Sequence, residues 1–153
     1  MAPQGKTKPP LLAFVICEKA LLDQDKVASL IRIVDIFTLN VEVAGVSEEE
    51  LQKVSVGMTC TVFTRWGPGG GDFTEELRIV MPDGTELPGK AQVPFSKPPG
   101  FHFQQNWHDV SLGVLESGLY NFRVYLDGDL VAEHPFRVQV NKKAVQALGP
   151  QSH

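Results

Sequence analysis

Residues 116–140 read ESGLYNFRVYLDGDLVAEHPFRVQV, and this stretch decides the fold. Apolar and polar residues alternate through its first half, and the alternation returns in its second half. A period of two is typical of β-strands that bury one face. The Asp127-Gly128 pair between the halves favours a tight turn, because glycine adopts positive φ without steric strain. The stretch therefore predicts a β-hairpin.

The start of this hairpin, ESGLYNF at residues 116–122, resembles the acid-Ser-Gly-x-Tyr-x-Cys signature of immunoglobulin-like domains. The resemblance implies a tyrosine corner, in which the hydroxyl of Tyr120 bonds back to the backbone ahead of the strand. Phe122 stands where that signature has its disulfide cysteine. The alternative is a tyrosine on a binding surface. Strand alternation favours the corner, because it groups Tyr120 with the core positions.

The remainder of the chain is mostly strand-like, and its 153 residues suit a single domain. Ser47 and Glu50 form a capping-box pattern, which predicts one short helix near 47–54. Further strands are expected at 11–20, 29–43, 56–66, 73–81, 91–95 and 101–112. The first two are apolar on both faces, so 11–20 should be internal to a sheet and 29–43 should be covered on both faces, with a bulge or a break near 38–40 because of its length. In contrast, 101–112 is polar and suits a sheet edge. We expect an all-β fold, an immunoglobulin-like antiparallel β-sandwich of seven to nine strands.

Composition also sets the expected boundaries. Residues 1–10 are rich in proline and lysine and should form a disordered tail. The domain is expected to span 11–140, followed by a C-terminal tail at 141–153. The glycine-rich segment 67–71 lacks the Gly-Lys-Ser/Thr ending of a phosphate loop and precedes a strand, so it is interpreted as a flexible hairpin connection.

The wider pattern resembles an uncharacterised bacterial family of small all-β proteins, a domain of unknown function. The matching pieces are LLAFVIC at 11–17, SLIRIVD at 29–35, Arg65-Trp66 beside a glycine-rich turn, and Gly-x-Tyr-x-Phe-x-Val at 118–124 followed by Leu-Asp-Gly. These are strand and turn features, and the family implies no activity, cofactor or site residue.

Charge and hydropathy exclude some classes of partner. The net charge is −4 and the basic residues are scattered, which argues against nucleic-acid binding. No apolar run approaches the roughly 20 residues that a membrane helix needs. The start of the chain has a short apolar stretch without a cleavage site for a signal peptide. Cys17 and Cys60 lie in apolar strands and suit buried, unpaired thiols. We expect a cytoplasmic protein without a membrane partner.

No pattern for catalysis or for a cofactor is legible. His102 and His108 are six residues apart on one predicted strand, too distant for a shared metal ion. Asp127 and Asp129, combined with Asp23 and Asp25 from another loop, could serve calcium, but Asp-Gly turns occur for backbone reasons alone. A Gly-x-Ser-x-Gly elbow is absent, and Cys60 should stay protonated within an apolar strand. We predict a protein that is not an enzyme and has no cofactor.

Aromatic and basic residues near the connections are the best candidates for binding, because Trp and Arg are enriched at interface anchors. The candidate residues are Arg65, Trp66, His102, Trp107 and His108, with Phe101 and Phe103 beside them. The competing interpretation is that Phe101, Phe103 and Trp107, which share one parity, are core. We predict a non-enzymatic module that binds a protein or associates with itself, aided by edge strands within 29–43 and 101–112. The alternative is a carbohydrate- or small-ligand-binding sandwich that uses Trp66 and Trp107.

Overall fold

The computed structural model describes residues 6–22, 27–100 and 102–146, with the backbone alone at 88–91. These residues form nine strands and one short helix, within the expected range of strands. The strands are β1 (Leu11–Leu22), β2 (Ala28–Ile33), β3 (Ile36–Ala44), β4 (Val56–Trp66), β5 (Gly71–Val80), β6 (Glu86–Lys97), β7 (Gln104–Val114), β8 (Gly118–Leu126) and β9 (Asp129–Val145). The helix is α1 (Glu48–Gln52).

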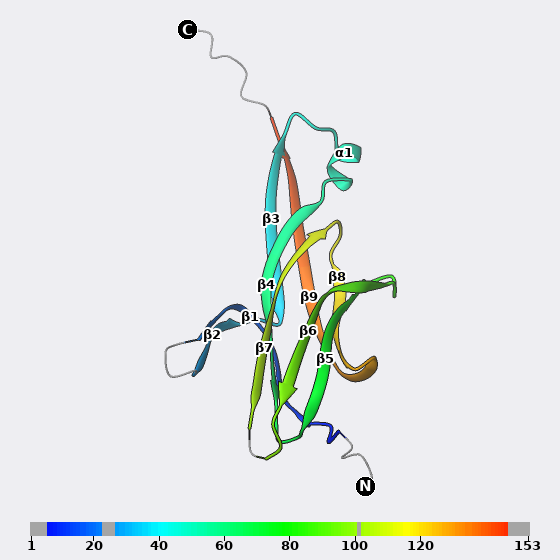
Figure 1. Ribbon diagram of the computed structural model, residues 1–153. Helices are drawn as coiled ribbons and strands as arrows, with labels where there is room; N and C mark the ends of the chain where they lie inside the picture. The colour runs from blue at the N-terminus through cyan, green and yellow to red at the C-terminus, as the bar shows by residue number, and fades with distance from the viewer. Residues whose placement is uncertain (1–5, 23–26, 101, 147–153) are drawn as a thin grey trace.

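The strands form two sheets that pack face to face (Figure 1). One sheet has the order β2-β1-β4-β7 and the other has the order β3-β9-β8-β5-β6. Neighbouring strands are antiparallel except β3, which runs parallel to β9. The run β9-β8-β5-β6 follows the order of strands G, F, C and C′ in variable-type immunoglobulin domains. The expected immunoglobulin-like sandwich is confirmed.

The hydrophobic core lies between the sheets and takes one face from each strand. On β4 the even-numbered side chains point inward, as do the even-numbered ones of β8. The largest fully buried apolar side chains are Trp66, Tyr120, Phe122, Phe136, Ile16 and Leu51. Phe122 and Phe136 stack with ring centroids 4.5 Å apart. Burying a side chain of this size contributes about 1.5–3 kcal/mol to folding.

The predicted tyrosine corner is present. The Tyr120 hydroxyl donates a 3.0 Å hydrogen bond to the backbone oxygen of Glu116, four residues earlier. The hairpin after it closes through Asp127 and Gly128, which both have positive φ, as a type I′ turn requires. The side chain of Asp127 accepts hydrogen bonds from Thr74 N at 2.8 Å and from Lys6 Nζ at 2.9 Å. This aspartate therefore fixes the turn against β5.

The capping box predicted for the helix is also present. Ser47 Oγ accepts a hydrogen bond from Glu50 N, and the Glu50 carboxylate accepts one from Ser47 N. The helix buries Leu51 and ends at Gln52, with Lys53 as its C-cap. Its short length follows from the polar residues after Leu51 and from the start of β4 at Val56.

The prediction of one covered strand at 29–43 is wrong. The chain breaks at Val34 and Asp35 and passes from one sheet to the other, so β2 and β3 are edge strands of different sheets. Arg32, just before the break, has φ of 53°. Apolar residues on both faces suggested a buried strand, but β2 and β3 each lie at the edge of a sheet. In contrast, β1 is internal and β7 lies at an edge, as predicted.

Residues 6–10 and the glycine-rich segment differ from the expectation of a loose tail and a flexible hairpin. The segment connects β4 in one sheet to β5 in the other, so it is an arch between layers. Thr7 and Gly70 exchange backbone hydrogen bonds of 2.9 and 3.0 Å, and Gly67 N donates to Pro10 O at 2.8 Å. A Cβ at Gly69 would lie 2.7 Å from Thr7 O. Glycine is needed there because two backbone segments approach each other closely.

The structure places the ends of two other elements differently from the sequence prediction. Strand β9 continues to Val145, because its pairing with β3 extends to Ala44, so the C-terminal tail does not begin at residue 141. Strand β6 spans Glu86–Lys97, longer than the edge strand expected at 91–95. Its pairing with β5 is interrupted by a register shift between Leu77 and Ile79, which accommodates the prolines and glycine of this stretch.

Candidate functional site

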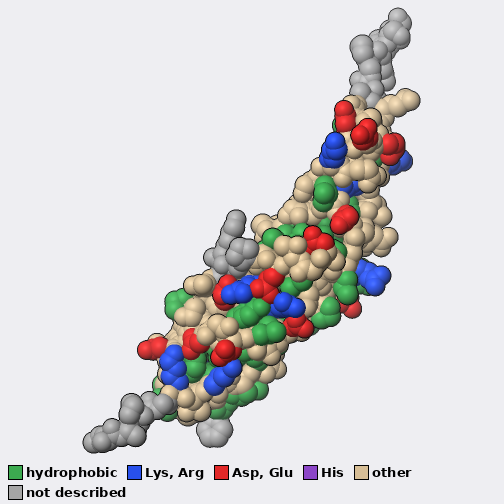
Figure 2. Space-filling view, turned by 90° about the vertical axis from the view of Figure 1, so that its right-hand side faces the viewer, with side chains coloured by type: hydrophobic (Ala, Val, Ile, Leu, Met, Phe, Trp, Pro, Cys, Tyr) green, Lys and Arg blue, Asp and Glu red, His purple; other side chains and the backbone are tan. Residues whose placement is uncertain are grey.

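The two outer faces of the sandwich differ in chemistry. The five-stranded sheet carries a network of paired charges centred on Glu86. Its carboxylate accepts hydrogen bonds of 2.8 Å from Arg78, Arg123 and the Tyr125 hydroxyl. These bonds, led by that from Arg78, lower the pKa of Glu86 to about 2. On the side where β5, β6 and β8 lie, acidic and basic side chains lie next to one another (Figure 2). The charges around Glu86 are therefore paired with one another and suit contact with water.

The outer face of the four-stranded sheet is apolar and aromatic by comparison. It is formed by odd-numbered residues of β1, β4 and β7 and by Phe103 just before β7, since the even-numbered residues of these strands enter the core. We call this surface the aromatic face; its residues are Ala13, Val15, Phe63, Arg65, Phe103, Gln105, Trp107 and Asp109. Trp107 is 40% exposed and Phe103 is 47% exposed. Large aromatic side chains in such positions are typical of an interaction surface.

The charged groups of the aromatic face lie on either side of an aromatic pair. In the β4–β7 register Phe63 is opposite Trp107, Arg65 is opposite Gln105 and Thr61 is opposite Asp109. The Arg65 guanidinium carbon lies 4.6 Å from the centre of the Phe103 ring. Arg65 Nε is buried without a hydrogen-bond partner. Asp109 accepts a 3.0 Å hydrogen bond from the Thr61 hydroxyl. The guanidinium is thus held in place without an anionic partner among the described residues.

A two-stranded arm extends the four-stranded sheet beyond the sandwich. It consists of residues 18–22 of β1, which have no pairing with β4, and of β2 (Figure 1). Strand register places the side chains of Leu21, Ile31 and Ile33 on the same side of the sheet as the aromatic face. All three are exposed, Ile33 by 69%. The arm therefore adds aliphatic surface and an unpaired strand edge beside the aromatic face.

A buried polar cluster links the two sheets from inside. Glu75 of β5 is fully buried and accepts hydrogen bonds from Trp66 Nε1 at 2.6 Å and from the Thr64 hydroxyl at 2.5 Å. Its second carboxylate oxygen meets Nε2 of His108. An ionised carboxylate can only accept hydrogen bonds, so Nε2 carries the proton. Three donors from the four-stranded sheet thus converge on one acid of the five-stranded sheet.

The pKa of Glu75 is lowered despite its burial. Desolvation acts to raise this pKa, and the hydrogen bonds from His108, Thr64 and Trp66, with the attraction of the His108 ring, outweigh it. Two atoms nearby on β7, His108 Nδ1 and Asn106 Nδ2, are buried without a hydrogen-bond partner. The cluster is sealed from solvent, which suits a structural role and leaves no access for a substrate.

The structure separates the five predicted binding residues. Arg65 and Trp107 lie on the aromatic face, whereas Trp66 and His108 lie in the core and both contact Glu75. His102 is exposed ahead of β7, and its backbone oxygen accepts a hydrogen bond from Lys97 Nζ. Phe103 and Trp107 are half-exposed rather than core, and Phe101 lies outside the described residues.

Sequence reasoning missed Phe63 and Asp109 as parts of this face. The available signal was parity: Arg65 and Trp66 are adjacent in a strand, as are Trp107 and His108, so each pair must point to opposite faces. Once Trp66 is assigned to the core, Arg65 and Phe63 follow to the outside. The pairing that places Trp107 and Asp109 beside them is long-range and has no signal in the sequence.

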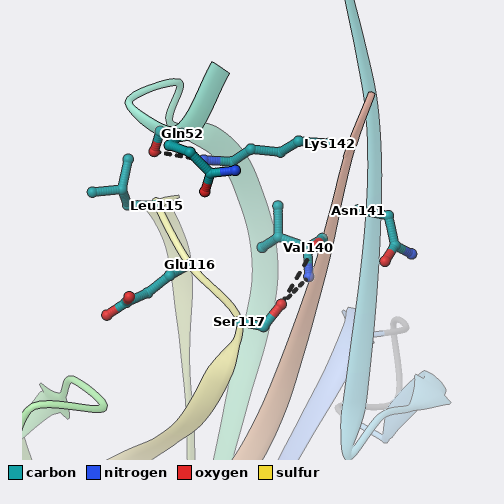
Figure 3. A pocket seen from close by; sticks show the side chains of 7 residues that line it. All are labelled: Gln52, Leu115, Glu116, Ser117, Val140, Asn141 and Lys142. Atoms are coloured by element: carbon teal, nitrogen blue, oxygen red, sulfur yellow. Dashed lines mark hydrogen bonds between the residues drawn. The ribbon is translucent and has the colours of Figure 1, made fainter. Parts of the chain in front are cut away.

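Two shallow pockets offer less chemistry. One, of about 390 Å³, lies where α1 and the connection between β7 and β8 meet β9 (Figure 3). Its polar groups bond to one another: Ser117 Oγ accepts from Val140 N at 2.8 Å, and Lys142 Nζ donates to Gln52 O at 3.2 Å. The other, of about 430 Å³, lies at the base of the arm and is lined by residues of β1, β4 and β7, including Cys60. Burial raises the pKa of the Cys60 thiol to about 12, which keeps it protonated.

The described parts of the chain contain no group of three or more His, Cys, Asp or Glu side chains that is arranged to hold a metal ion. Asp23 and Asp25, which the calcium interpretation would require, lie outside the described residues. With five residues, α1 is far too short to cross a bilayer, and it is the one helix within the described ranges.

Comparison with known proteins gives limited information. No family model matches the chain, and no curated protein matches it in sequence. The resemblance to an uncharacterised bacterial family therefore stays a resemblance.

Solved structures give low-scoring matches. The CARDB domain of a Pyrococcus furiosus protein, solved with di-metal ions, is 12% identical, with 92% of this chain and 97% of that chain covered and a TM-score of 0.41. An immunoglobulin-like protein from Pseudomonas aeruginosa is 14% identical over 91% of this chain and 100% of that chain, with a TM-score of 0.34. β-Glucosidase 3B from Thermotoga neapolitana is 19% identical, with a TM-score of 0.44. That match covers 56% of this chain, which spans 15% of the β-glucosidase chain. At these TM-scores the matches carry no functional argument.

Proposed function

We propose that the chain is a non-enzymatic protein-binding module and that the aromatic face, with the arm beside it, is the surface that binds. The observation that carries this proposal is the asymmetry of the sandwich. Around Glu86 the outer face of the five-stranded sheet has its charges paired, whereas the opposite face leaves the aromatic rings of Phe103 and Trp107 half-exposed to water. Half-exposed aromatic rings gain stabilisation when a partner covers them.

The arm supports the same surface. Ile31 and Ile33 expose aliphatic side chains on a strand whose outer edge has no pairing in the four-stranded sheet. Such an edge is a template for an additional strand. A partner that covers the aromatic face would therefore also reach backbone donors and acceptors on β2.

Binding rather than catalysis fits the placement of the reactive groups. The carboxylate–imidazole pair of Glu75 and His108 is enclosed in the core. The thiols of Cys17 and Cys60 are buried and unpaired, and burial raises the pKa of both. Unpaired thiols in a sandwich without a disulfide fit a reducing, cytoplasmic setting.

A photo-crosslinking amino acid at position 107 tests the proposal, with the same amino acid at position 125 on the charged face as the matched control. We expect a discrete protein adduct in the native lysate from position 107 and none from 125. Adding Ile33→Asp should reduce the yield of the adduct, because a charge on the arm opposes desolvation. Equal labelling from both positions, or none from either, would contradict the proposal.

Carbohydrate or small-ligand binding is the alternative. Of the two tryptophans that this alternative uses, only Trp107 is accessible to a ligand. Trp66 is fully buried, so stacking on a sugar ring would fall to Trp107 and Phe103. Titration with a panel of glycans should shift the emission of Trp107 if this alternative holds. Emission that stays unchanged across the panel would remove it.

A further inference from the structure

We infer that the partner of the aromatic face is a second copy of this chain, packed face to face about a two-fold axis through the Phe63–Trp107 pair. This inference rests on the proposed function, and it adds the identity of the partner. A two-fold interface must be self-complementary, so that each residue i that contacts j in the partner is matched by j contacting i. The aromatic face meets that condition.

The self-complementarity lies in Arg65 and Asp109. Arg65 lies two residues beyond Phe63 along β4, and Asp109 lies two residues beyond Trp107 along β7. Because β4 and β7 are antiparallel, the two charged residues lie on opposite sides of the Phe63–Trp107 pair. A two-fold axis that lies in the plane of the face, perpendicular to the strands and through this pair, exchanges the two sides. Each Arg65 then faces the partner's Asp109, and Trp107 meets its own equivalent on the axis.

Each of these groups gains from such a contact. Arg65 lacks an anionic partner among the described residues, and its Nε has no hydrogen-bond acceptor. The Asp109 carboxylate is exposed and receives one hydrogen bond, from Thr61. Packed sheets lie about 10 Å apart, which places two layers of side chains in contact. The charge pairs would fix the register, and the aromatic rings would supply most of the buried apolar area.

The outer face of the five-stranded sheet does not offer this arrangement. Two of its arginines are already paired, Arg78 with Glu76 and Glu86, and Arg123 with Glu86 and Glu133. A copy that docked there would have to break these bonds. The aromatic face is therefore the face that a second copy would use.

Charge reversal tests both the partner and the axis. The variants are Arg65→Asp, Asp109→Arg and the double variant with both changes, and Arg137→Asp on the other sheet is the control. Sedimentation equilibrium of the purified chain should give about twice the 16.8 kDa of one chain for the wild type and for the control. Each single variant places two like-charge pairs across the interface and should raise the dissociation constant by roughly 10-fold to 100-fold.

Restoration is the decisive result. The double variant recreates both opposite-charge pairs and should dimerise as the wild type does. An equimolar mixture of Arg65→Asp and Asp109→Arg should form a heterodimer, because each copy supplies what the other lacks. A failure of both the double variant and the mixture to dimerise would overturn the proposed axis. So would single variants that dimerise as tightly as the wild type.

Fluorescence quenching gives a second measurement of dimerisation, independent of sedimentation. Trp66 is fully buried, so a soluble quencher such as acrylamide reports on Trp107. We expect quenching to fall as the wild-type concentration rises through the dissociation constant, and to stay constant for Arg65→Asp. A wild-type protein that remains monomeric at about 100 µM overturns the inference. If position 107 still crosslinks to a different protein, the proposed function stands; if it crosslinks to nothing, both fail.

Discussion

Glu75 on β5 and His108 on β7 meet in the interior, so that one carboxylate of the five-stranded sheet contacts an imidazole of the four-stranded sheet. Trp66 and Thr64 complete the contact with two further hydrogen bonds to Glu75. In immunoglobulin domains a disulfide joins the sheets at their centre, and here the two cysteines are unpaired. The polar cluster supplies a directional link between the layers in its place.

Removing the Glu75 side chain should be strongly destabilising, because it leaves buried donors without an acceptor. We expect Glu75→Ala to lower the free energy of unfolding by about 3–5 kcal/mol, measured by urea denaturation. Glu75→Gln should cost less, since the amide oxygen still accepts from Trp66 and Thr64. A loss below about 1 kcal/mol for Glu75→Ala would show that the cluster adds little to stability.

Glu86 should make stability depend on pH in the acid range. Its pKa is about 2 in the folded protein against an ordinary value of 4.5, so the unfolded chain binds the proton more readily. The stabilisation is complete above pH 4.5 and is lost as the pH falls toward 2. Glu86→Gln should therefore lose less stability than the wild type over this interval. At neutral pH the difference should be about 1 kcal/mol or less, because the group is partly solvated.

Chemical denaturation between pH 2 and 6, at low and at high salt, measures this difference. Glu75 titrates in both proteins, so comparison with Glu86→Gln isolates the contribution of Glu86. Salt should shrink the difference, because exposed charges are screened. Parallel stability curves for the two proteins would contradict the prediction.

The hydroxyl of Tyr120 should contribute to stability through its bond to the backbone of Glu116. Tyr120→Phe keeps the stacking on Phe136 and removes only this hydrogen bond. We expect a loss of about 1 kcal/mol in the free energy of unfolding. Tyr125→Phe is the matched control, because its hydroxyl bonds to Glu86 in the partly solvated network and should matter less. Equal losses for the two variants would argue against a special role of the corner.

Gly69→Ala should weaken the contact between residues 6–10 and the glycine-rich arch at 67–71. A Cβ at this position would lie 2.7 Å from Thr7 O and 2.9 Å from Pro9 Cα, so the backbone must move. We expect a cost of about 1–3 kcal/mol and faster hydrogen exchange at the amides of Thr7 and Gly70. Gly57→Ala is the control, since a Cβ there has no neighbour within 4 Å. Unchanged exchange at Thr7 in Gly69→Ala would contradict the prediction.

Much of the fold was predictable because its signals are local. The tyrosine corner joins residues four apart, the type I′ turn needs two residues, and the capping box joins residues three apart. The break at Val34 and Asp35 was not predictable in the same way. The length of the apolar run from Ser29 to Val43 suggests a bulge or a break near 38–40, but the run satisfies strand propensity on both sides of the observed break, so nothing local places it at Val34 and Asp35.

The candidate site was predictable only in part. Arg65 and Trp107 were expected at a binding surface, and the structure places both on the outer face of the four-stranded sheet. Their sequence neighbours Trp66 and His108 were included as well, and both are core. Residue type does not separate Trp107 from Trp66 and His108, since aromatic rings and imidazoles serve in cores and in interfaces alike.

The sequence by itself determined which residues alternate, where turns close and where the helix begins, because these depend on contacts within a few residues. Only the tertiary structure decided which face of each strand meets the opposite sheet. Strand alternation divides residues into two sets, but pairing between distant segments assigns one set to the core. Through that pairing Glu75 reaches His108 inside the sandwich, while Arg65, Trp107 and Asp109 come together outside it.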